Sequence, residues 1–235
     1  MTDTSETKVI LWDFDGTLAY RDGMWGAALL EVLQSASPET RASREAMRPF
    51  LQAGFPWHAP SIPHTDIRSS DEWWARLAPV FERTFIGVGI DEALAREMAR
   101  QVRTRFCDKT AWHLYEDVLP ALARLAEQGW SHHILSNHVP ELGDLVRALG
   151  LAESVKAVHC SAVSGYEKPH PEAFRRSVAG LPSDATVWMI GDNVDVDVLG
   201  AEACGIRAIL VRKPDSRAAR YSEGLSGVGE LLNAT

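Results

Sequence analysis

Hydrophobic and polar positions follow two different patterns in two parts of the chain. After about residue 115, short apolar runs alternate with stretches of helical spacing, and glycines close several of these stretches. The apolar runs, together with an earlier one, predict strands at 8–12, 131–135, 155–160, 186–190 and 207–211. Helices are predicted at 117–128, 140–149, 171–179 and 195–204. Such alternation with short connections predicts a parallel sheet that helices cover on both faces.

The stretch from about 24 to 110 has a helical pattern throughout, and no strand is predicted in it. Apolar residues recur at helical spacing in 24–34 and in 91–106. Another helix begins after Ser69, which forms a capping-box pattern with Glu72. Pro79 lies inside that helix, so we expect a kink or an early end there.

The two patterns together predict the fold class and the domain organisation. The strand at 8–12 belongs with the later strands, so the helical stretch interrupts the α/β part. We expect a Rossmann-like doubly wound parallel sheet, formed by residues 1–19 and 113–235, as the α/β core. An α-helical insert of residues 20–112 interrupts it. The segment from about 214 onward is too irregular to assign.

Composition and charge narrow the range of partners. The 235 residues carry a formal net charge of −8, which argues against nucleic acid, because a phosphate backbone needs clustered positive charge. Neither the polar start, residues 1–8, nor any later run has the pattern of a signal peptide or a membrane span. The three cysteines are far apart and fit reduced thiols. We therefore expect a cytoplasmic protein with no membrane partner; the oligomeric state is left open.

Polar residues suited to chemistry follow the ends of several predicted strands. Asp13 and Asp15 come directly after the first strand and, being two residues apart in extended backbone, point the same way. Gly16 lets the backbone approach a ligand closely, and Thr17 supplies a hydroxyl. Later strand ends and loops contribute further groups: Ser136 and Asn137, Lys168, Gly191 and Asp192, with Asp195 and Asp197 beyond them.

These groups should meet at one edge of the sheet, where open α/β folds bind ligands. An ionised aspartate that attacks a phosphate dianion faces strong repulsion in a water-poor site. Oxygen-bound Mg²⁺ and a lysine ammonium would offset that repulsion. The set therefore suits a phosphate held against a hard metal ion.

Four motifs occur in a fixed order along the chain: DFDGT at 13–17, SN at 136–137, KP at 168–169 and GDNVDVD at 191–197. In order, spacing and secondary structure they resemble the haloacid-dehalogenase-like hydrolase superfamily, in its phosphatase branch with a helical cap between the first and second motifs. The resemblance covers the whole chain. It implies a Mg²⁺-dependent phosphohydrolase that acts on a small phosphorylated metabolite through an aspartyl-phosphate.

The resemblance also implies a role for each motif residue. Asp13 would attack phosphorus, and Asp15 would protonate the leaving oxygen and later activate water. Mg²⁺ would be held by Asp13, the backbone carbonyl of Asp15 and Asp192. Phosphate binding would fall to Thr17, Ser136, Asn137 and Lys168. Supporting roles would fall to Gly16, Gly191, Asn193 and Asp197, whereas the family pattern does not require Asp195.

Other reactions on the same fold are weighed against this one. A phosphomutase remains open, and would hold a bisphosphate while its substrate turns over. Haloacid dehalogenases are disfavoured because they lack an acid at the position of Asp15 and need no metal. A phosphonatase needs a cap lysine, and residues 18–108 contain none. A catalytically silent scaffold is disfavoured because every motif residue is present.

Residues in the cap admit two interpretations. Its tryptophans could line a substrate pocket, but we favour a cap core, because amphipathic helices bury aromatic residues anyway; they are Trp25, Trp57, Trp73 and Trp74. Its arginines could bind a second anionic group of the substrate, although a solvated helix face is the simpler expectation; they are Arg21, Arg41, Arg44, Arg48, Arg68 and Arg76. Zinc binding is disfavoured, since no ligand spacing recurs among His132, His133, His138 and His170.

Overall fold

A six-stranded parallel sheet forms the centre of the α/β part in the computed structural model, which describes residues 7–234. The polar start of the chain lies outside the described residues, apart from residues 7 and 8. The strand order is β5 (Val155–Cys160), β4 (Trp130–Ser136), β1 (Lys8–Trp12), β6 (Thr186–Gly191), β7 (Arg207–Val211) and β8 (Tyr221–Ser222). All five predicted strands are present, and every neighbouring pair is parallel.

Helices cover both faces of this sheet, which confirms the doubly wound α/β class. Along β1 the side chains alternate between the faces: Ile10 and Trp12 belong to one hydrophobic cluster, and Val9 and Leu11 to the other. The first cluster includes α5 (Val118–Glu127), α6 (Leu142–Ala148) and α10 (Val228–Asn233). The second includes α8 (Pro171–Val178) and α9 (Gly200–Glu202); a short helix α7 (Ser161–Ser164) follows β5.

The helix predicted at 195–204 has a different form. Residues Val194–Leu199 make a π-helical turn, η4, and α9 follows it directly. The N–H of Val198 reaches the carbonyl of Asn193, five residues earlier, at 3.4 Å. π-turns are frequent at functional sites because they re-aim the side chains of one turn.

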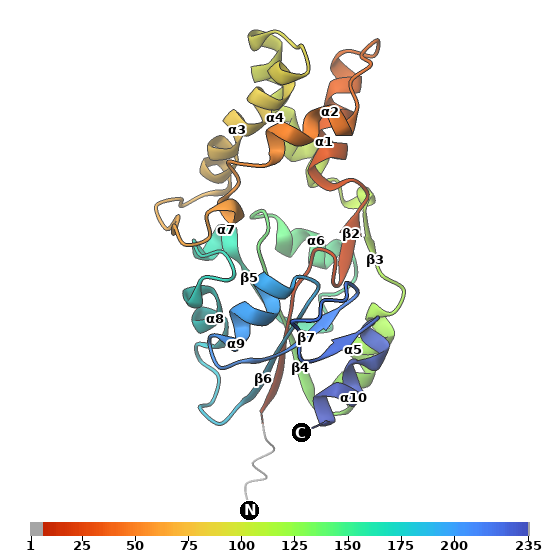
Figure 1. The fold of residues 1–235 in the computed structure, drawn as a ribbon, viewed down its shortest axis with the longest axis vertical. Coiled ribbons are helices and arrows are strands. Elements are labelled where there is room, and N and C mark those ends of the chain that lie inside the picture. Colours follow the sequence, from red (N-terminus) through yellow and green to blue (C-terminus); the bar gives the residue numbers. More distant parts are fainter. Residues whose placement is uncertain (1–6, 235) are drawn as a thin grey trace, which may run out of the picture.

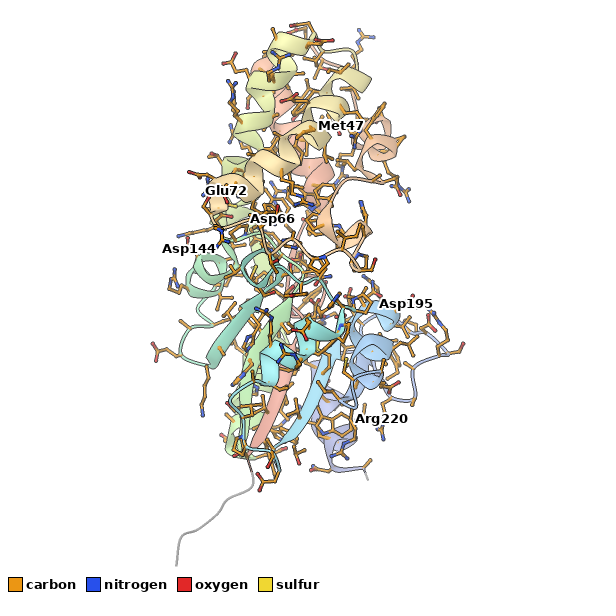
Figure 2. All side chains as sticks on the ribbon, turned by 90° about the vertical axis from the view of Figure 1, so that its left-hand side faces the viewer. Met47, Asp66, Glu72, Asp144, Asp195 and Arg220 are labelled. Carbon is orange, nitrogen blue, oxygen red and sulfur yellow. The ribbon has the colours of Figure 1, made fainter. Side chains whose placement is uncertain are left out.

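A layer of helices lies beyond the carboxyl ends of the strands (Figure 1). It contains α1 (Met24–Ala36), α2 (Arg44–Met47), α3 (Ser70–Gly87) and α4 (Glu92–Phe106), with short 3₁₀ turns η1 (Arg48–Leu51), η2 (Pro56–His58) and, after α4, η3 (Lys109–Ala111). Figure 2 shows Met47 far from the sheet, and Asp66 and Glu72 nearer the level at which the two layers meet.

Helix α3 begins as predicted and ends later than predicted. The Ser69 side chain accepts a hydrogen bond from the Glu72 N–H at 3.2 Å, as a capping box requires. The helix then continues through Pro79 to Gly87, so an early end at the proline is wrong. Pro79 lies on the exposed face, while the opposite face buries Leu77, Phe81 and its other apolar residues. That burial outweighs the one hydrogen bond that proline removes.

Two short strands join the layers. The chain leaves the α/β part through β2 (Ala19–Arg21) and returns through β3 (Trp112–Leu114), and the two strands pair antiparallel. Three residues are too few to show a period of two, so the pattern did not predict either strand. The unassigned end of the chain contains β8, the turn η5 (Leu225–Gly227) and α10.

Within residues 7–234 there is no helix with both the length and the apolar character that crossing a membrane requires.

Candidate active site

Asp13 is the point at which several segments of the chain meet. It follows β1 directly, is 7% exposed, and its N–H donates to the carbonyl of Ile190 on β6 at 2.9 Å. Its Oδ1 accepts hydrogen bonds from the Ser136 hydroxyl at 3.0 Å and from Lys168 Nζ at 2.9 Å. Its Oδ2 accepts one from the Thr17 hydroxyl at 3.3 Å. The carboxylate is therefore fixed in one orientation by three donors.

Lys168 is a fully enclosed cation shared by two carboxylates. Its side chain is 1% exposed, and Nζ lies 2.6 Å from Asp197 Oδ1 as well as beside Asp13. Burial works to lower the pKa of Lys168, but the two carboxylates outweigh it and raise that pKa. The lysine therefore remains charged and holds Asp13 and Asp197 together.

The Asn137 side chain forms hydrogen bonds with the backbone of the loop that carries Lys168. Its Nδ2 donates to the Lys168 carbonyl at 2.8 Å, and its Oδ1 accepts from the Lys168 N–H at 2.7 Å. Both polar atoms of the side chain that was predicted to bind phosphate are thus occupied. In this structure the Asn137 side chain positions Lys168.

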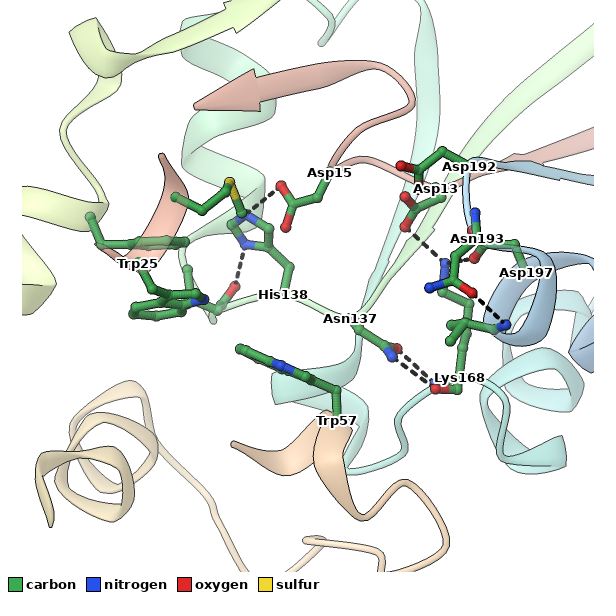
Figure 3. Close-up of a pocket in the computed structure, with 14 residues that line it drawn as sticks. Asp13, Asp15, Trp25, Trp57, Asn137, His138, Lys168, Asp192, Asn193 and Asp197 are labelled. Atoms are coloured by element: carbon green, nitrogen blue, oxygen red, sulfur yellow. Dashed lines mark hydrogen bonds and ion pairs between the residues drawn. The ribbon is translucent and has the colours of Figure 1, made fainter. Parts of the chain in front are cut away.

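The Asp15 side chain points toward His138 (Figure 3). Its Oδ1 lies 3.5 Å from His138 Nε2, and neither atom has a hydrogen-bond partner among the described residues. Burial, followed by repulsion from Asp13 and Asp192, raises the pKa of Asp15 well above its usual range. A carboxyl in this position favours its protonated form, which a general acid needs.

His138 is suited to stabilise that protonated form. Burial lowers the pKa of His138 to about 4, so the ring is neutral near pH 7. Its Nδ1 lies 3.3 Å from the carbonyl of Val139, which assigns the ring proton to Nδ1 and leaves Nε2 as an acceptor for Asp15. The sequence pattern suggested no role for His138 apart from the disfavoured zinc site. Its position two residues after Ser136, at the same strand end, was the signal that could have placed it in the site.

Three carboxylates form a cluster that could hold a metal ion. Asp13, Asp192 and Asp197 each offer an oxygen, and these oxygens all lie within 4.8 Å of one another. Burial and repulsion from Asp13 raise the pKa of Asp192, although the ion pair with Lys213 opposes that rise. Hard oxygen donors with unbalanced negative charge fit a divalent cation such as Mg²⁺. Among the described residues no histidine belongs to a comparable cluster.

Two predicted glycines leave room for these carboxylates. Gly16 has φ +81°, and a Cβ there would overlap the Asp192 carboxylate. A Cβ on Gly191 would overlap the carboxylate of Asp197 in the same way. Any larger residue at either position would push a carboxylate out of the cluster.

The remaining residues of the last motif divide between the site and the surface. The Asn193 N–H donates to Asp197 Oδ2 at 3.1 Å, and its side-chain oxygen accepts from the first N–H groups of η4. Asp195 is exposed and pairs with Arg217 at 2.7 Å. Figure 2 shows Asp195 at the outer side of the α/β part. Asp195 therefore takes no part in the cluster.

A cavity of about 460 Å³ connects these groups with the helical layer. Its lining from the helical layer is Met24, Trp25, Trp57 and Phe106. The expected cap core is correct for Trp73 and Trp74, which are 1% and 8% exposed, whereas Trp25 and Trp57 face the cavity. None of the six arginines considered for a second anion lines it.

Glu141 ties the helical layer to the sheet beside this cavity. It precedes α6 and accepts hydrogen bonds from the Ser70 hydroxyl at 2.6 Å, Trp74 Nε1 at 3.0 Å and Arg103 Nε at 2.9 Å. Burial works to raise the pKa of Glu141, but these donors outweigh it and lower that pKa. A second contact joins His64 to Glu167 at 3.0 Å, with both side chains buried.

Known proteins share this sequence pattern and this fold. Residues 7–205 match the family model of haloacid dehalogenase-like hydrolases. A phosphoserine phosphatase from Thermus thermophilus is 30% identical over 225 residues, which cover 87% of this chain and 88% of that protein. A haloacid dehalogenase-like hydrolase domain-containing protein 3 from Bos taurus is 24% identical over 92% of this chain and 86% of its own length.

Two solved structures show the same fold. The magnesium-bound HAD-hydrolase YfnB from Bacillus subtilis superposes with a TM-score of 0.71 at 18% identity, over 97% of this chain and 100% of that one. An L-2-haloacid dehalogenase from Xanthobacter autotrophicus gives a TM-score of 0.67 at 20% identity, over 97% and 99%. At these identities the likeness concerns the fold alone.

Proposed function

This chain belongs to the haloacid dehalogenase-like hydrolase family, and we propose that it is a Mg²⁺-dependent phosphatase that hydrolyses a small phosphomonoester through a phosphate bound covalently to Asp13. The observation that carries the proposal is the pair formed by Asp13, held by three donors, and Asp15, a half-buried carboxyl with a raised pKa two residues away. One group is prepared to attack and the other to give up a proton.

In the first half-reaction, an Asp13 carboxylate oxygen attacks phosphorus and the ester P–O bond breaks. The leaving alkoxide takes the proton of Asp15, so an alcohol departs and Asp15 is left ionised. Lys168 and the Ser136 hydroxyl, which bind Asp13 Oδ1, lie where negative charge on the phosphoryl oxygens would develop.

In the second half-reaction, ionised Asp15 takes a proton from water as that water attacks phosphorus. The bond between Asp13 and phosphorus breaks, which releases inorganic phosphate and restores both carboxyl groups to their starting states. A bound Mg²⁺ would reduce the repulsion between the carboxylates and the phosphate. Asp13 and Asp192, together with the backbone carbonyl of Asp15, are the proposed ligands, and Asp197 supports them through Lys168.

The helical layer has its own proposed task. We assign residues 20–112 to a cap that covers the cavity and restricts water during the first step. The apolar side chains that it contributes to the cavity support this assignment. The catalytic core would comprise residues 1–19 and 113–235.

Phosphate release from p-nitrophenyl phosphate with Mg²⁺ tests the proposal. Asp13→Asn should abolish turnover. Asp15→Asn should lower kcat by roughly 10²–10⁴-fold, the usual effect of losing a general base, because nitrophenolate leaves without a proton but the second step still needs Asp15 to activate water. Asp195→Asn is the matched control, because this aspartate follows β6 next to the site but points outward and pairs with Arg217; it should retain wild-type activity. Equal activity of wild type and Asp13→Asn would rule the mechanism out.

Two alternatives give different products. A haloacid dehalogenase would release halide without metal, and Asp15 and the carboxylate cluster count against that reaction. A phosphomutase would transfer the phosphoryl group to a second hydroxyl of the substrate. Halide release, or a transferred phosphoryl group with no free phosphate, would favour the corresponding alternative.

A further inference from the structure

We propose that the substrate is a phosphomonoester whose leaving group presents an uncharged, flat apolar surface and carries no second anionic group. The proposal rests on the phosphatase function argued above and adds the substrate class to it. Three features carry it: the composition of the cavity wall, the arrangement of its aromatic rings, and the distribution of charge around it.

The cavity has a polar end and an apolar end. Asp13, Asp192, Asp197 and Lys168 lie together at one end, Trp25 and Trp57 lie at the other, and Asp15 lies between them (Figure 3). Val139 of the α/β part adds to the apolar end. A phosphate held at Asp13 would therefore direct its ester group toward apolar side chains.

Two indole rings, those of Trp25 and Trp57, belong to the apolar end. Trp25 stacks on Phe106, with ring centroids 3.7 Å apart and an interplanar angle of 9°. Trp57 stacks on Phe55 in the same way, at 4.7 Å and 14°. Each indole is thus fixed by a neighbour, and the two indoles lie 6.0 Å apart at 31°. Both remain half-buried, so they can offer ring surface to a ligand without rearranging.

The cavity has no cation free to bind a second anion. Among its lining residues Lys168 is the one basic side chain with a fixed charge, and Asp13 and Asp197 already share its ammonium. His138 is the other titratable nitrogen there and is buried. Two arginines are engaged elsewhere: Arg21 of β2 with Glu31, and Arg103 of α4 with Glu141 and Asp71.

Negative charge dominates the walls. Four aspartates line the cavity against one lysine; with Asp15 protonated and a divalent cation bound, the charges of this lining sum to zero and leave none to attract a second anion. A carboxylate or second phosphate on the leaving group would be desolvated beside these groups with no partner, which is unfavourable. Stacking on the indoles carries no such penalty.

Matched esters test the proposal with the full-length protein and Mg²⁺. The reference substrate is benzyl phosphate. Compared with it, 4-carboxybenzyl phosphate carries one additional carboxylate, and ethyl phosphate lacks the aromatic ring. We expect kcat/KM for benzyl phosphate to exceed that for each of the other two by about tenfold, as one well-placed aromatic contact allows. Phosphoserine, which carries a carboxylate, should also be a poor substrate.

Variants at Trp57 connect that preference to the cavity. Trp57→Ala should reduce the benzyl-to-ethyl ratio of kcat/KM toward one, mainly by raising KM for benzyl phosphate, and Trp57→Phe should restore most of the ratio. Trp57 lies in a short, half-buried turn, and unchanged thermal unfolding of both variants would exclude a folding defect.

The failure of this proposal can be distinguished from failure of the phosphatase function. Acetyl phosphate needs no apolar contact and reports the chemistry alone. If wild type hydrolyses acetyl phosphate but prefers 4-carboxybenzyl phosphate, phosphoserine or ethyl phosphate to benzyl phosphate, the substrate class is wrong and the chemistry stands. If wild type hydrolyses none of these compounds, the proposed function itself is overturned.

Discussion

Lys168 is the side chain whose loss should most perturb the candidate site, and Lys168→Met tests this directly. Methionine keeps a similar length and removes the charge. In the wild type the ammonium lies 2.9 Å from Asp13 and 2.6 Å from Asp197, in a position that is 1% exposed. The substitution would leave two buried carboxylates without their common cation.

The size of the effect follows from these contacts. At an effective dielectric constant of about 20, Coulomb's law gives roughly 6 kcal/mol for each contact. Desolvation of the three charges offsets most of this attraction, and breaking a buried pair by removing one partner costs about 3–5 kcal/mol. We therefore expect Lys168→Met to lower the free energy of unfolding by about 3–5 kcal/mol, out of a total of roughly 5–15 kcal/mol.

Urea unfolding near neutral pH measures this change, and a second substitution identifies its origin. Asp197→Asn removes one of the two carboxylates that Lys168→Met leaves without a cation. The loss of unfolding free energy in the Lys168→Met/Asp197→Asn double variant should therefore be clearly smaller than the sum of the losses in the two single variants. Lys213→Met is the control: this lysine pairs with Asp192 but is 73% exposed, and should change stability by at most about 1 kcal/mol.

The result that would refute the reasoning is specific. A loss below about 1 kcal/mol in Lys168→Met, together with a coupling to Asp197 within about 0.5 kcal/mol of zero, would mean that the buried ion pairs do not organise the site.

The glycine, proton-donor and interlayer features give three further predictions. Gly16→Ala should weaken Mg²⁺ binding, measured by calorimetry, because the new Cβ would meet the Asp192 carboxylate. Gly150→Ala is its control: it places alanine at a similar positive φ, +77° against +81°, but its Cβ meets no other group, so Mg²⁺ binding should not change. The folded-state pKa of Asp15 is raised, so its ionisation opposes folding above its unfolded pKa; Asp15→Asn should therefore raise the unfolding free energy of the metal-free protein at about pH 8 and hardly change it at about pH 3. Glu141→Gln should lower the unfolding free energy by about 1–3 kcal/mol in urea unfolding, because it weakens charge-assisted hydrogen bonds from three donors of the helical layer.

The candidate catalytic and metal-binding residues could be assigned to one site from the sequence, because the carboxyl ends of parallel strands lie at the same edge of a sheet. Buried parallel strands are rich in apolar residues, so the end of each predicted strand marks a point on one edge of the sheet. Asp13 and Asp192 follow β1 and β6, and Ser136 is the last residue of β4; these three strands are neighbours in the sheet. Their meeting follows from the strand order alone, although they are separated by more than fifty residues in the sequence.

The wall of the cavity could not be placed in this way. Trp25 and Trp57 look like Trp73 and Trp74 in the sequence, since all four are aromatic residues in a helical stretch. Which of them faces the cavity depends on how the helices pack against one another and on the angle set by β2 and β3. Those strands are three residues long each, too short to leave a periodic signal.

Position at a strand end also does not determine what a side chain does there. Ser136, Asn137 and His138 are consecutive and share one strand end, yet they act on three different groups. Ser136 binds the Asp13 carboxylate, Asn137 binds the backbone beside Lys168, and His138 faces Asp15. Each role is set by the partner that another segment brings within reach, and partners 31 or 123 residues away in the sequence leave no local pattern. The motif therefore predicts that the three residues belong to the site, and the fold assigns to each the group on which it acts.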